Sequence, residues 1–408
     1  MKNKFFDKTF KSLKYKNFRI FFLAQIVSLL GTWIQSVAQS WLMWRITNSP
    51  ALLGFLGFAQ TSPILFLGLI GGVVADKTNR KKLLIFTQSL AFIQAVTFAV
   101  LMIFDLITPL YIFILATALG IINAFDMTGR QTFLGDMVEP QDLGNAIALN
   151  SLLFNTARVI GPPIGGYIIA VIGEAACFIT NAVSFFFVLC ALLLIRIEKK
   201  KEVKFSSNTS SFRDALIYFK KNHIQRNVLL ILMILSFFIF PYLYFLPYFA
   251  DKVLGGKAQL LGNMFSAAGF GAIVGAILMA KTPRLETLPR ILGYSSFFLS
   301  IVLTFFTLSK NLHLSLFLIF LMGFFTIIST ACTNIFLQST SPPQIRGKVI
   351  SFYITFFHGF PPLGSLLTGF LTKSHNTESV LFTFSIITVL ISTTYFLTHC
   401  VGKKFENC

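Results

Sequence analysis

Three ionisable side chains, Asp126, Arg158 and His358, stand inside long apolar stretches of the sequence. A charge at the centre of a bilayer costs about 3 kcal/mol or more unless it is paired or hydrated, so such residues are usually functional. Asp126 is the nearest plausible partner of Arg158 by sequence, and separation of the pair would let the Asp126 carboxylate take up a proton. Asp126 is therefore a candidate for proton coupling, with a structural ion pair as the alternative. The imidazole of His358 suits a proton relay or, as the alternative, simple helix packing.

The composition shows what must hold these residues. Of the 408 residues 55% are hydrophobic and 12% are charged, about half the charged share of a soluble domain. Uninterrupted apolar segments of about 20 residues predict membrane-spanning helices, because only helices and closed barrels satisfy the backbone in lipid. The sequence predicts an all-α polytopic membrane protein and no enzyme, with twelve transmembrane helices near residues 20–44, 51–75, 83–104, 108–128, 146–171, 175–195, 227–250, 259–280, 291–309, 314–337, 348–372 and 378–398.

The basic residues are distributed unevenly along the chain. With an even number of spans both termini lie on one side, and the segments on that side hold most of the 34 Lys and Arg. The segments on the other side hold Arg45, Lys252, Lys257, Lys310 and Lys373. This bias predicts that both termini are cytoplasmic, so the net charge of +19 reports topology rather than nucleic-acid binding. The five scattered Cys predict neither a metal site nor disulfides, and no cofactor is expected.

The second half of the chain repeats the first. At an offset of 203 residues Gly120, Pro140 and Gly144 match Gly323, Pro343 and Gly347, and further on Pro162 and Pro163 match Pro361 and Pro362. The repeat predicts two six-helix bundles that rock about a midplane site, as in a transporter, with a receptor or scaffold as the alternative. The predicted domains are a basic cytoplasmic N-terminal segment (1–19), a first bundle (20–195), a cytoplasmic linker (196–226), a second bundle (227–398) and a cytoplasmic tail (399–408). In the N-terminal segment Phe6, Phe10 and Leu13 favour a helix on the membrane surface, with a disordered tail as the alternative.

The hairpin between the second and third spans holds Gly72, Asp76, Lys77, Arg80 and Lys81. It resembles the signature loop G-x-x-x-D-R-x-G-R-K of the major facilitator superfamily. Lys77 replaces an Arg and Asn79 replaces a Gly, and Asn79 is expected to tolerate the left-handed backbone of that turn. The resemblance implies a gating latch in which Asp76 and Arg80 act against the start of span eleven near Gly347; a hairpin that only enforces topology is the alternative.

The fifth span carries Gly161, Pro162, Gly165 and Gly166, with Pro361 and Pro362 as counterparts in span eleven. Small residues allow close helix approach, and proline permits a bend, so these positions suit a hinge or seal. The run resembles the superfamily's antiporter motif G-x-x-x-G-P-x-x-G-G, with Ala157 at the first glycine. That resemblance implies proton-driven export; a pure packing role is the alternative.

Aromatic and amide side chains are the candidates for a substrate cavity. The first span sets Trp33, Gln35 and Gln39 near one another, and Tyr242 and Tyr244 follow a proline that is expected to break span seven. Such linings suit bulky amphipathic ligands.

Over nearly the whole chain the pattern is similar to one branch of the superfamily, the transmembrane secretion effectors, which include the enterobactin exporter and drug/proton antiporters. The similarity rests on the run from Ser28 to Gln35, on Phe18-Arg19 and on the run from Asn145 to Ser151. It implies a monomer in the bacterial inner membrane that uses the proton gradient to export a siderophore or an amphipathic drug-like small molecule. A siderophore importer, a lysophospholipid flippase and a non-transporting membrane receptor remain as alternatives.

Overall fold

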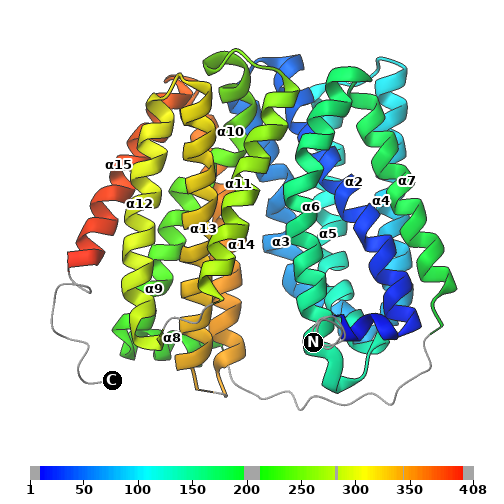
Figure 1. Cartoon of the computed structure of the whole chain (residues 1–408), viewed down its shortest axis with the longest axis horizontal. Helices are drawn as coiled ribbons and strands as arrows, with labels where there is room; N and C mark the ends of the chain where they lie inside the picture. Colours follow the sequence, from blue (N-terminus) through cyan, green and yellow to red (C-terminus); the bar gives the residue numbers. More distant parts are fainter. Residues whose placement is uncertain (1–9, 197–211, 281–283, 343, 398–408) are drawn as a thin grey trace, which may run out of the picture. The chain divides into compact units, whose positions relative to one another are not determined.

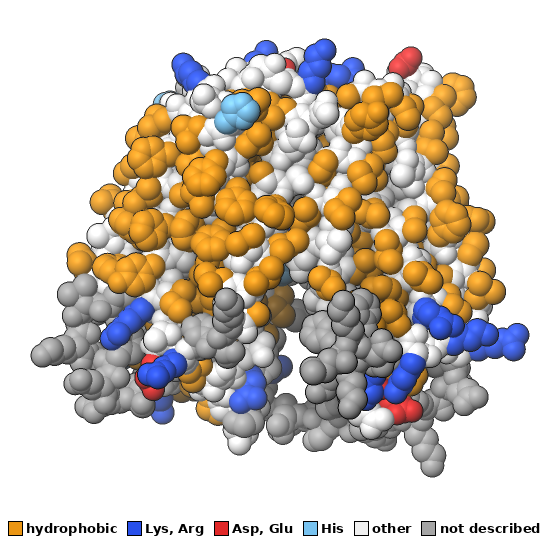
Figure 2. Space-filling model, viewed as in Figure 1, with side chains coloured by type: hydrophobic (Ala, Val, Ile, Leu, Met, Phe, Trp, Pro, Cys, Tyr) orange, Lys and Arg blue, Asp and Glu red, His pale blue; other side chains and the backbone are white. Residues whose placement is uncertain are grey.

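The computed structural model describes residues 10–196, 212–280, 284–342 and 344–397. Helices dominate these residues, and no strand occurs among them, which confirms the all-α prediction. Ten helical stretches of the described chain are long and apolar enough to cross a membrane. Hydrophobic side chains cover the middle of the helices, while Lys and Arg gather near helix ends (Figure 2), as expected for a protein whose helices are immersed in lipid.

Each predicted span corresponds to a helical segment of the described chain (Figure 1). The first six are α2 (Lys16–Thr47), α3 (Pro50–Lys77), α4 (Arg80–Ile103), α5 (Pro109–Met137), α6 (Leu143–Val171) and α7 (Glu174–Leu194). The seventh comprises α9 (His223–Ile234), the π-helical turn η3 (Leu235–Ile239), α10 (Tyr242–Tyr248) and the π-helical turn η4 (Phe249–Val253). The remaining five are α11 (Ala258–Met279), α12 (Leu288–Leu308), α13 (Leu312–Thr340), α14 (Arg346–Leu371) and α15 (Thr377–Phe396).

Two of these helices, α6 and α14, are not among the ten strongly apolar stretches. Both contain a proline pair and several polar side chains in their middle turns. These two helices carry Arg158 and His358, whereas Asp126 lies on α5, which is among the ten.

The first compact unit comprises residues 1–48, 59–203 and 256–266. In it α2 packs along both α6 and α7, and α4 packs against α5 and α7. An aromatic core lies near the start of α2, where Phe21 contacts Phe133 of α5 edge to face at 5.7 Å between ring centroids. The start of α11 belongs to this unit because Gly262 fits against the carbonyl of Pro162.

The second compact unit comprises residues 49–58, 204–255 and 267–408. Here α12 packs against α13 and α15, and α14 packs against η3. α11 approaches α13 closely where Gly271 faces the carbonyl of Phe320, which only a small residue permits. The first turns of α3 belong to this unit, since Ser365 of α14 donates a 3.1 Å hydrogen bond to the carbonyl of Gly54.

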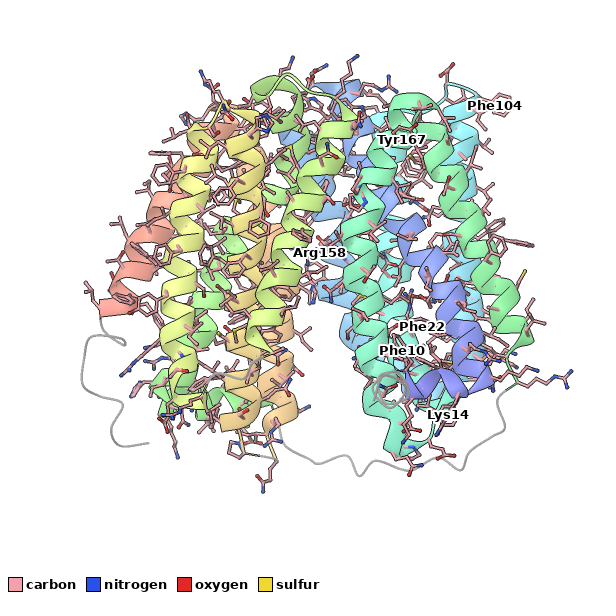
Figure 3. The ribbon with its side chains drawn as sticks, viewed as in Figure 1. Phe10, Lys14, Phe22, Phe104, Arg158 and Tyr167 are labelled. Atoms are coloured by element: carbon pink, nitrogen blue, oxygen red, sulfur yellow. The ribbon has the colours of Figure 1, made fainter. Side chains whose placement is uncertain are left out.

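The start of the described chain is attached to the loop between α5 and α6. A 3₁₀ turn, η1 (Lys11–Lys14), precedes α2, and a second one, η2 (Pro140–Asp142), precedes α6. Lys11 and Lys14 form ion pairs of 2.6 and 2.9 Å with Asp142, which is 2% exposed. Figure 3 labels Phe10 and Lys14 at this position. Residues 11–14 therefore form a short 3₁₀ helix that buried Asp142 holds in place. A position of this helix on the membrane surface stays a prediction, and Phe6 lies outside the described residues.

Part of the predicted linker is a helix. α8 (Phe212–Lys221) carries Ala215 and Phe219, both buried. The ring of Phe219 contacts Phe352 of α14, and the hydroxyl of Tyr218 donates to the carbonyl of Thr340 at 3.2 Å. The end of the linker thus packs on the second unit, and residues 197–211 lie outside the described chain.

Candidate functional site

Asp126 of α5 lies at the centre of a buried polar cluster in the first unit. Its side chain is 2% exposed. Its Oδ1 accepts hydrogen bonds from Thr87 Oγ1 at 2.9 Å and from Gln88 Nε2 at 2.8 Å, both on α4. Its Oδ2 forms an ion pair with Arg130, one helical turn further along α5.

Arg130 extends this cluster to a third helix. Its Nη1 donates to Gln25 Oε1 of α2 at 2.8 Å, so one carboxylate links α2, α4 and α5. The expectation that Asp126 pairs with Arg158 is wrong in this structure, because Arg130 occupies the i+4 position on the same helix face. That spacing was visible in the sequence and is the signal that identifies the partner.

The cluster is not saturated with hydrogen bonds. Within the described residues Gln88 Oε1 and Arg130 Nε are buried and make no hydrogen bond. Buried polar atoms of this kind commonly bind water or exchange partners. The cluster thus has the chemical groups needed to rearrange when the charge of Asp126 changes.

The amide residues of the first span lie inside the first unit. Gln35 is 1% exposed; it donates to Gln94 Oε1 at 3.2 Å and accepts from Asn181 Nδ2 at 2.8 Å. Gln35 therefore holds α2, α4 and α7 together and is not accessible to a substrate in this structure. Gln39 is also buried, at 2% exposed, while Trp33 is partly buried and packs on Gly161.

The seventh span is interrupted as the proline predicted. Helix α9 changes to the π-helical turn η3 before Pro241, and α10 begins at Tyr242. A proline lacks the N–H that a continuous helix needs, and π-helical turns occur often at functional sites. Tyr242 is buried, and the ring of Tyr244 lies against Gly57 of α3. Both tyrosines therefore belong to the packing around this interruption.

The antiporter-like motif packs α6 closely on its neighbours. α6 runs without a break through Pro162 and Pro163. A Cβ on Gly161 would lie 2.6 Å from the Cβ of Trp33, and one on Gly165 would lie 3.1 Å from the Ile34 backbone. A Cβ on Gly166 would lie 2.6 Å from the carbonyl oxygen of Ala258. These glycines have a packing function; the hinge role stays a prediction.

The counterpart in the second unit is built in the same way. α14 continues through Pro361 and Pro362, and Gly364 fits against the carbonyl of Phe237 in η3. A Cβ on Gly369 would lie 2.7 Å from the carbonyl oxygen of Ala51. In both units the segment after the proline pair therefore packs against backbone through glycine.

The signature loop contributes an ion pair within the first unit. Arg80 Nη1 donates to Asp136 Oδ1 of α5 at 2.7 Å, and Lys81 Nζ donates to the carbonyl of Ile195 at 2.7 Å. Lys77 ends α3 and is exposed. Gly72, also in α3, has open space at its Cβ position. The side chain of Asp76 lies outside the described residues, so the latch near Gly347 stays a prediction.

Asn79 stands in the turn of this loop but not in a left-handed conformation. Its φ is −66°, and its side chain accepts a 3.1 Å hydrogen bond from the backbone N–H of Lys82. The expectation of a left-handed Asn79 is wrong, because the residue acts as the N-cap of α4.

A polar stripe, defined by Ser151, Asn155 and Arg158, follows α6 at the spacing i, i+4, i+7. Ser151 is exposed, and Asn155 and Arg158 are partly exposed. Figure 3 shows Arg158 about midway along the helix. Ionisable groups at such depth usually face water rather than lipid. The stripe therefore indicates a water-accessible face of α6. The sequence pattern of isolated charges identified Arg158 but not its uncharged neighbours Ser151 and Asn155.

A second stripe follows α14 at the same spacing. Ser351, Thr355 and His358 lie 200 residues after Ser151, Asn155 and Arg158, an offset close to, but different from, the 203 and 199 of the matched motifs. Ser351 is partly exposed, and Thr355 and His358 are exposed. His358 therefore lies near the repeat counterpart of Arg158, one position away from the register of the proline pairs.

The model of the family described as transmembrane secretion effector matches residues 7–406. The chain belongs to this family. It is therefore a major facilitator transporter, and not an enzyme, as the sequence predicted.

Two relatives of this transporter are each about a quarter identical to it in sequence. It is 26% identical to the staphyloferrin A transporter of Staphylococcus aureus over 394 residues, which cover 95% of this chain and 98% of that protein. It is 23% identical to the multidrug efflux pump Tap of Mycolicibacterium fortuitum over 379 residues, with 90% and 92% covered.

Solved structures of transporters share its fold. A bacterial homologue of the human lysosomal transporter Spinster matches with a TM-score of 0.72 and 15% identity, covering 95% of this chain and 98% of that one. A D-xylose–proton symporter matches with a TM-score of 0.71 and 14% identity, covering 94% and 97%. At these identities the likeness concerns the fold alone, and it confirms the predicted arrangement of two six-helix repeats.

Proposed function

We propose that this transporter uses the proton gradient to export a siderophore or an amphipathic drug-like small molecule across the bacterial inner membrane by alternating access. The observation that carries the proposal is the buried ion pair of Asp126 and Arg130, with Thr87 and Gln88 as further partners of the carboxylate. The siderophore transporter and the efflux pump among its relatives support the substrate class. The transporter acts as a monomer with both termini in the cytoplasm.

Protonation of Asp126 supplies the coupling step. A neutral carboxylic acid attracts Arg130 less strongly than a carboxylate does, and it donates one hydrogen bond where the carboxylate only accepts. Because these bonds join α2, α4 and α5, uptake of a proton loosens the contact among three helices at once. Release of the proton on the other side of the membrane restores the contact and resets the transporter.

Substitution of Asp126 by Asn tests the coupling. Asn retains the shape of the side chain and cannot titrate, so Asp126→Asn should abolish transport driven by a pH gradient in proteoliposomes. Exchange of substrate across the membrane without a gradient should persist. Asp105→Asn is the matched control: Asp105 lies beyond the end of α4 with φ of 53°, a conformation that Asn tolerates. Unchanged gradient-driven transport by Asp126→Asn protein at normal protein level would refute the proposal.

The direction of transport and the substrate are tested in cells. A deletion strain and its complemented derivative are grown under iron starvation, and the compounds in the medium are compared by mass spectrometry. Loss of an iron-chelating compound from the medium of the deletion strain supports siderophore export. Altered antibiotic tolerance alone favours drug efflux, and reduced uptake of the iron-loaded compound favours the import alternative.

A further inference from the structure

Three exposed basic residues meet in the first unit where α2 begins and α7 ends. Lys16 and Arg19 lie in the first turn of α2, and Arg196 follows the last residues of α7. The side chain of Asn17 donates a 2.8 Å hydrogen bond to the carbonyl of Arg196, which ties the two helix ends together. We call Lys16, Arg19 and Arg196 the basic corner; in Figure 2, Lys and Arg side chains gather at this lower end of the unit, where its hydrophobic surface stops.

The start of α4 is bound to the same place. Lys81 Nζ donates to the carbonyl of Ile195, the residue before Arg196, at 2.7 Å. A side chain of α2 and a side chain of α4 therefore both hold the end of α7. The bias of basic residues toward one side of a membrane requires only that they lie in the loops of that side. These two hydrogen bonds do more, because they fix charges from different helices at one position.

The basic corner is not neutralised by acidic side chains. Among the residues that the structure describes, none of its three members takes part in an ion pair. At the same end of the unit the carboxylate of Asp136 is bound by Arg80, and that of Asp142 is bound by Lys11 and Lys14. The basic corner thus keeps three positive charges that can attract an anion.

An apolar surface begins within one helical turn of these charges. Leu23 stands four residues after Arg19 on α2, and Leu193 and Leu194 stand just before Arg196 at the end of α7. Each of these leucines is more than half exposed. They belong to the membrane-spanning helices, so they face the hydrocarbon chains of the bilayer. A phospholipid has the same order of parts, since its anionic phosphate lies directly above its acyl chains.

We propose that the basic corner binds the phosphate of one anionic phospholipid, whose acyl chains lie along Leu23 of α2 and Leu193 of α7. Arginine can donate two parallel hydrogen bonds to a phosphate, and lysine binds it as a point charge. Basic groups at a membrane surface attract anionic lipids, and each contributes roughly fivefold in affinity. The bound lipid bridges α2 and α7 and stabilises this end of the first unit, whatever the substrate of the transporter.

Binding is measured on the full-length protein, delipidated in detergent, by native mass spectrometry with phosphatidylglycerol as the probe. The first phosphatidylglycerol should bind at least about tenfold more tightly than phosphatidylcholine, which has no net charge. Inorganic phosphate in millimolar excess should not displace it, because free phosphate lacks the acyl chains. Displacement by inorganic phosphate would show a site for a soluble anion and would overturn the proposal.

Substitutions identify the site. Arg19→Gln combined with Arg196→Gln should weaken binding of the first phosphatidylglycerol about tenfold or more. Arg19→Lys combined with Arg196→Lys should retain more affinity than the Gln pair, because the charges remain. Lys220→Gln is the control, since Lys220 is an exposed cation at the end of α8 in the second unit, and it should leave the affinity unchanged.

Thermal unfolding measures the stabilisation. Phosphatidylglycerol should raise the midpoint of the wild type and of the Lys220→Gln protein, and it should raise that of the Gln pair much less. Equal binding of the charged and the neutral lipid would refute the proposal. So would unchanged affinity in the Gln pair, or an equal loss of affinity in the Lys220→Gln protein.

Discussion

The hydroxyl of Tyr248 donates a 2.7 Å hydrogen bond to the carboxylate of Glu378 in the first turn of α15. In the first unit Arg45, near the end of α2, binds Glu174 in the first turn of α7 at 2.6 Å. Tyr248 lies 203 residues after Arg45, and Glu378 lies 204 residues after Glu174. The two contacts therefore occupy corresponding places in the repeat, and each ties its first span to the start of its sixth. A glutamate suits that position because a helix N-terminus attracts negative charge.

The two contacts should respond differently to mutation and salt. Tyr248→Phe removes a neutral donor from a partly buried carboxylate and should cost about 1 kcal/mol of unfolding free energy. Arg45→Gln should cost less, because the Arg45 side chain is 51% exposed and salt screens such pairs. Thermal unfolding in detergent at low and high salt measures both effects. Equal loss of stability in both variants, with equal salt dependence, would contradict this account.

The ion pair of Arg80 and Asp136 connects the start of α4 to the end of α5. Either Arg80→Gln or Asp136→Asn should reduce transport severalfold, because each leaves one charge of the signature loop without its partner. The exchange of the two charges, Arg80→Asp with Asp136→Arg, should recover more transport than either single variant retains. Uptake or efflux assays in proteoliposomes measure this. A charge exchange as inactive as the single variants would mean that Arg80 acts chiefly on another group.

Gly161 and Gly135 should differ sharply in their tolerance of a methyl group. Gly161→Ala would place a Cβ 2.6 Å from that of Trp33 and should destabilise the protein by about 1–3 kcal/mol, as overpacking does. Gly135→Ala meets open space on α5 and should be neutral or stabilise the helix by up to about 1 kcal/mol. The midpoint of thermal unfolding, followed by size-exclusion chromatography, reports the difference. Equal midpoints for the two variants would show that α2 and α6 can move apart.

Attachment of the N-terminal segment should be independent of pH across the ordinary range. Hydrogen bonds from Lys11 and Lys14 hold the pKa of Asp142 well below its usual value, and the bond to Asp142 raises the pKa of Lys14. When the segment is detached, Asp142 has an ordinary pKa of about 4; when the segment is attached, the pKa of Asp142 is lower. The stabilisation by Asp142 is therefore present above about pH 4 and is lost as the pH falls through the lower pKa. For a raised lysine pKa it is present below about 10.5 and is lost as the pH rises beyond that.

Hydrogen exchange of residues 10–15 measures this attachment. Exchange protection, corrected for intrinsic rates, should stay constant from about pH 5 to pH 9, where neither group titrates. Asp142→Asn should release the segment and raise its exchange and its cleavage by proteases. Glu139→Gln is the control, because Glu139 is exposed and contacts Gln141. A protected segment in the Asp142→Asn protein would show that Ser12, which donates from its backbone to Asn145 at 2.9 Å, suffices for attachment.

The sequence by itself determined the spans, the repeat and the family. Membrane-spanning helices follow from hydropathy within about 20 neighbouring residues, and duplicated motifs follow from comparison of the two halves. Residues such as Pro241 and the glycines near Pro162 also acted locally, so their effects on helix continuity and close packing were predictable.

Only the tertiary structure decided which polar groups meet. The contacts of Asp126 with Thr87 and Gln88 and of Arg130 with Gln25 depend on the rotation of α5 against α4 and α2. Helix packing likewise buried Gln35 between Gln94 and Asn181. The attachment of Lys14 to Asp142 joins residues far apart in the sequence. Hydropathy predicts which residues of a helix span the membrane, but it does not predict which side of the helix packs against each neighbouring helix. These contacts therefore follow from the packing of the helices.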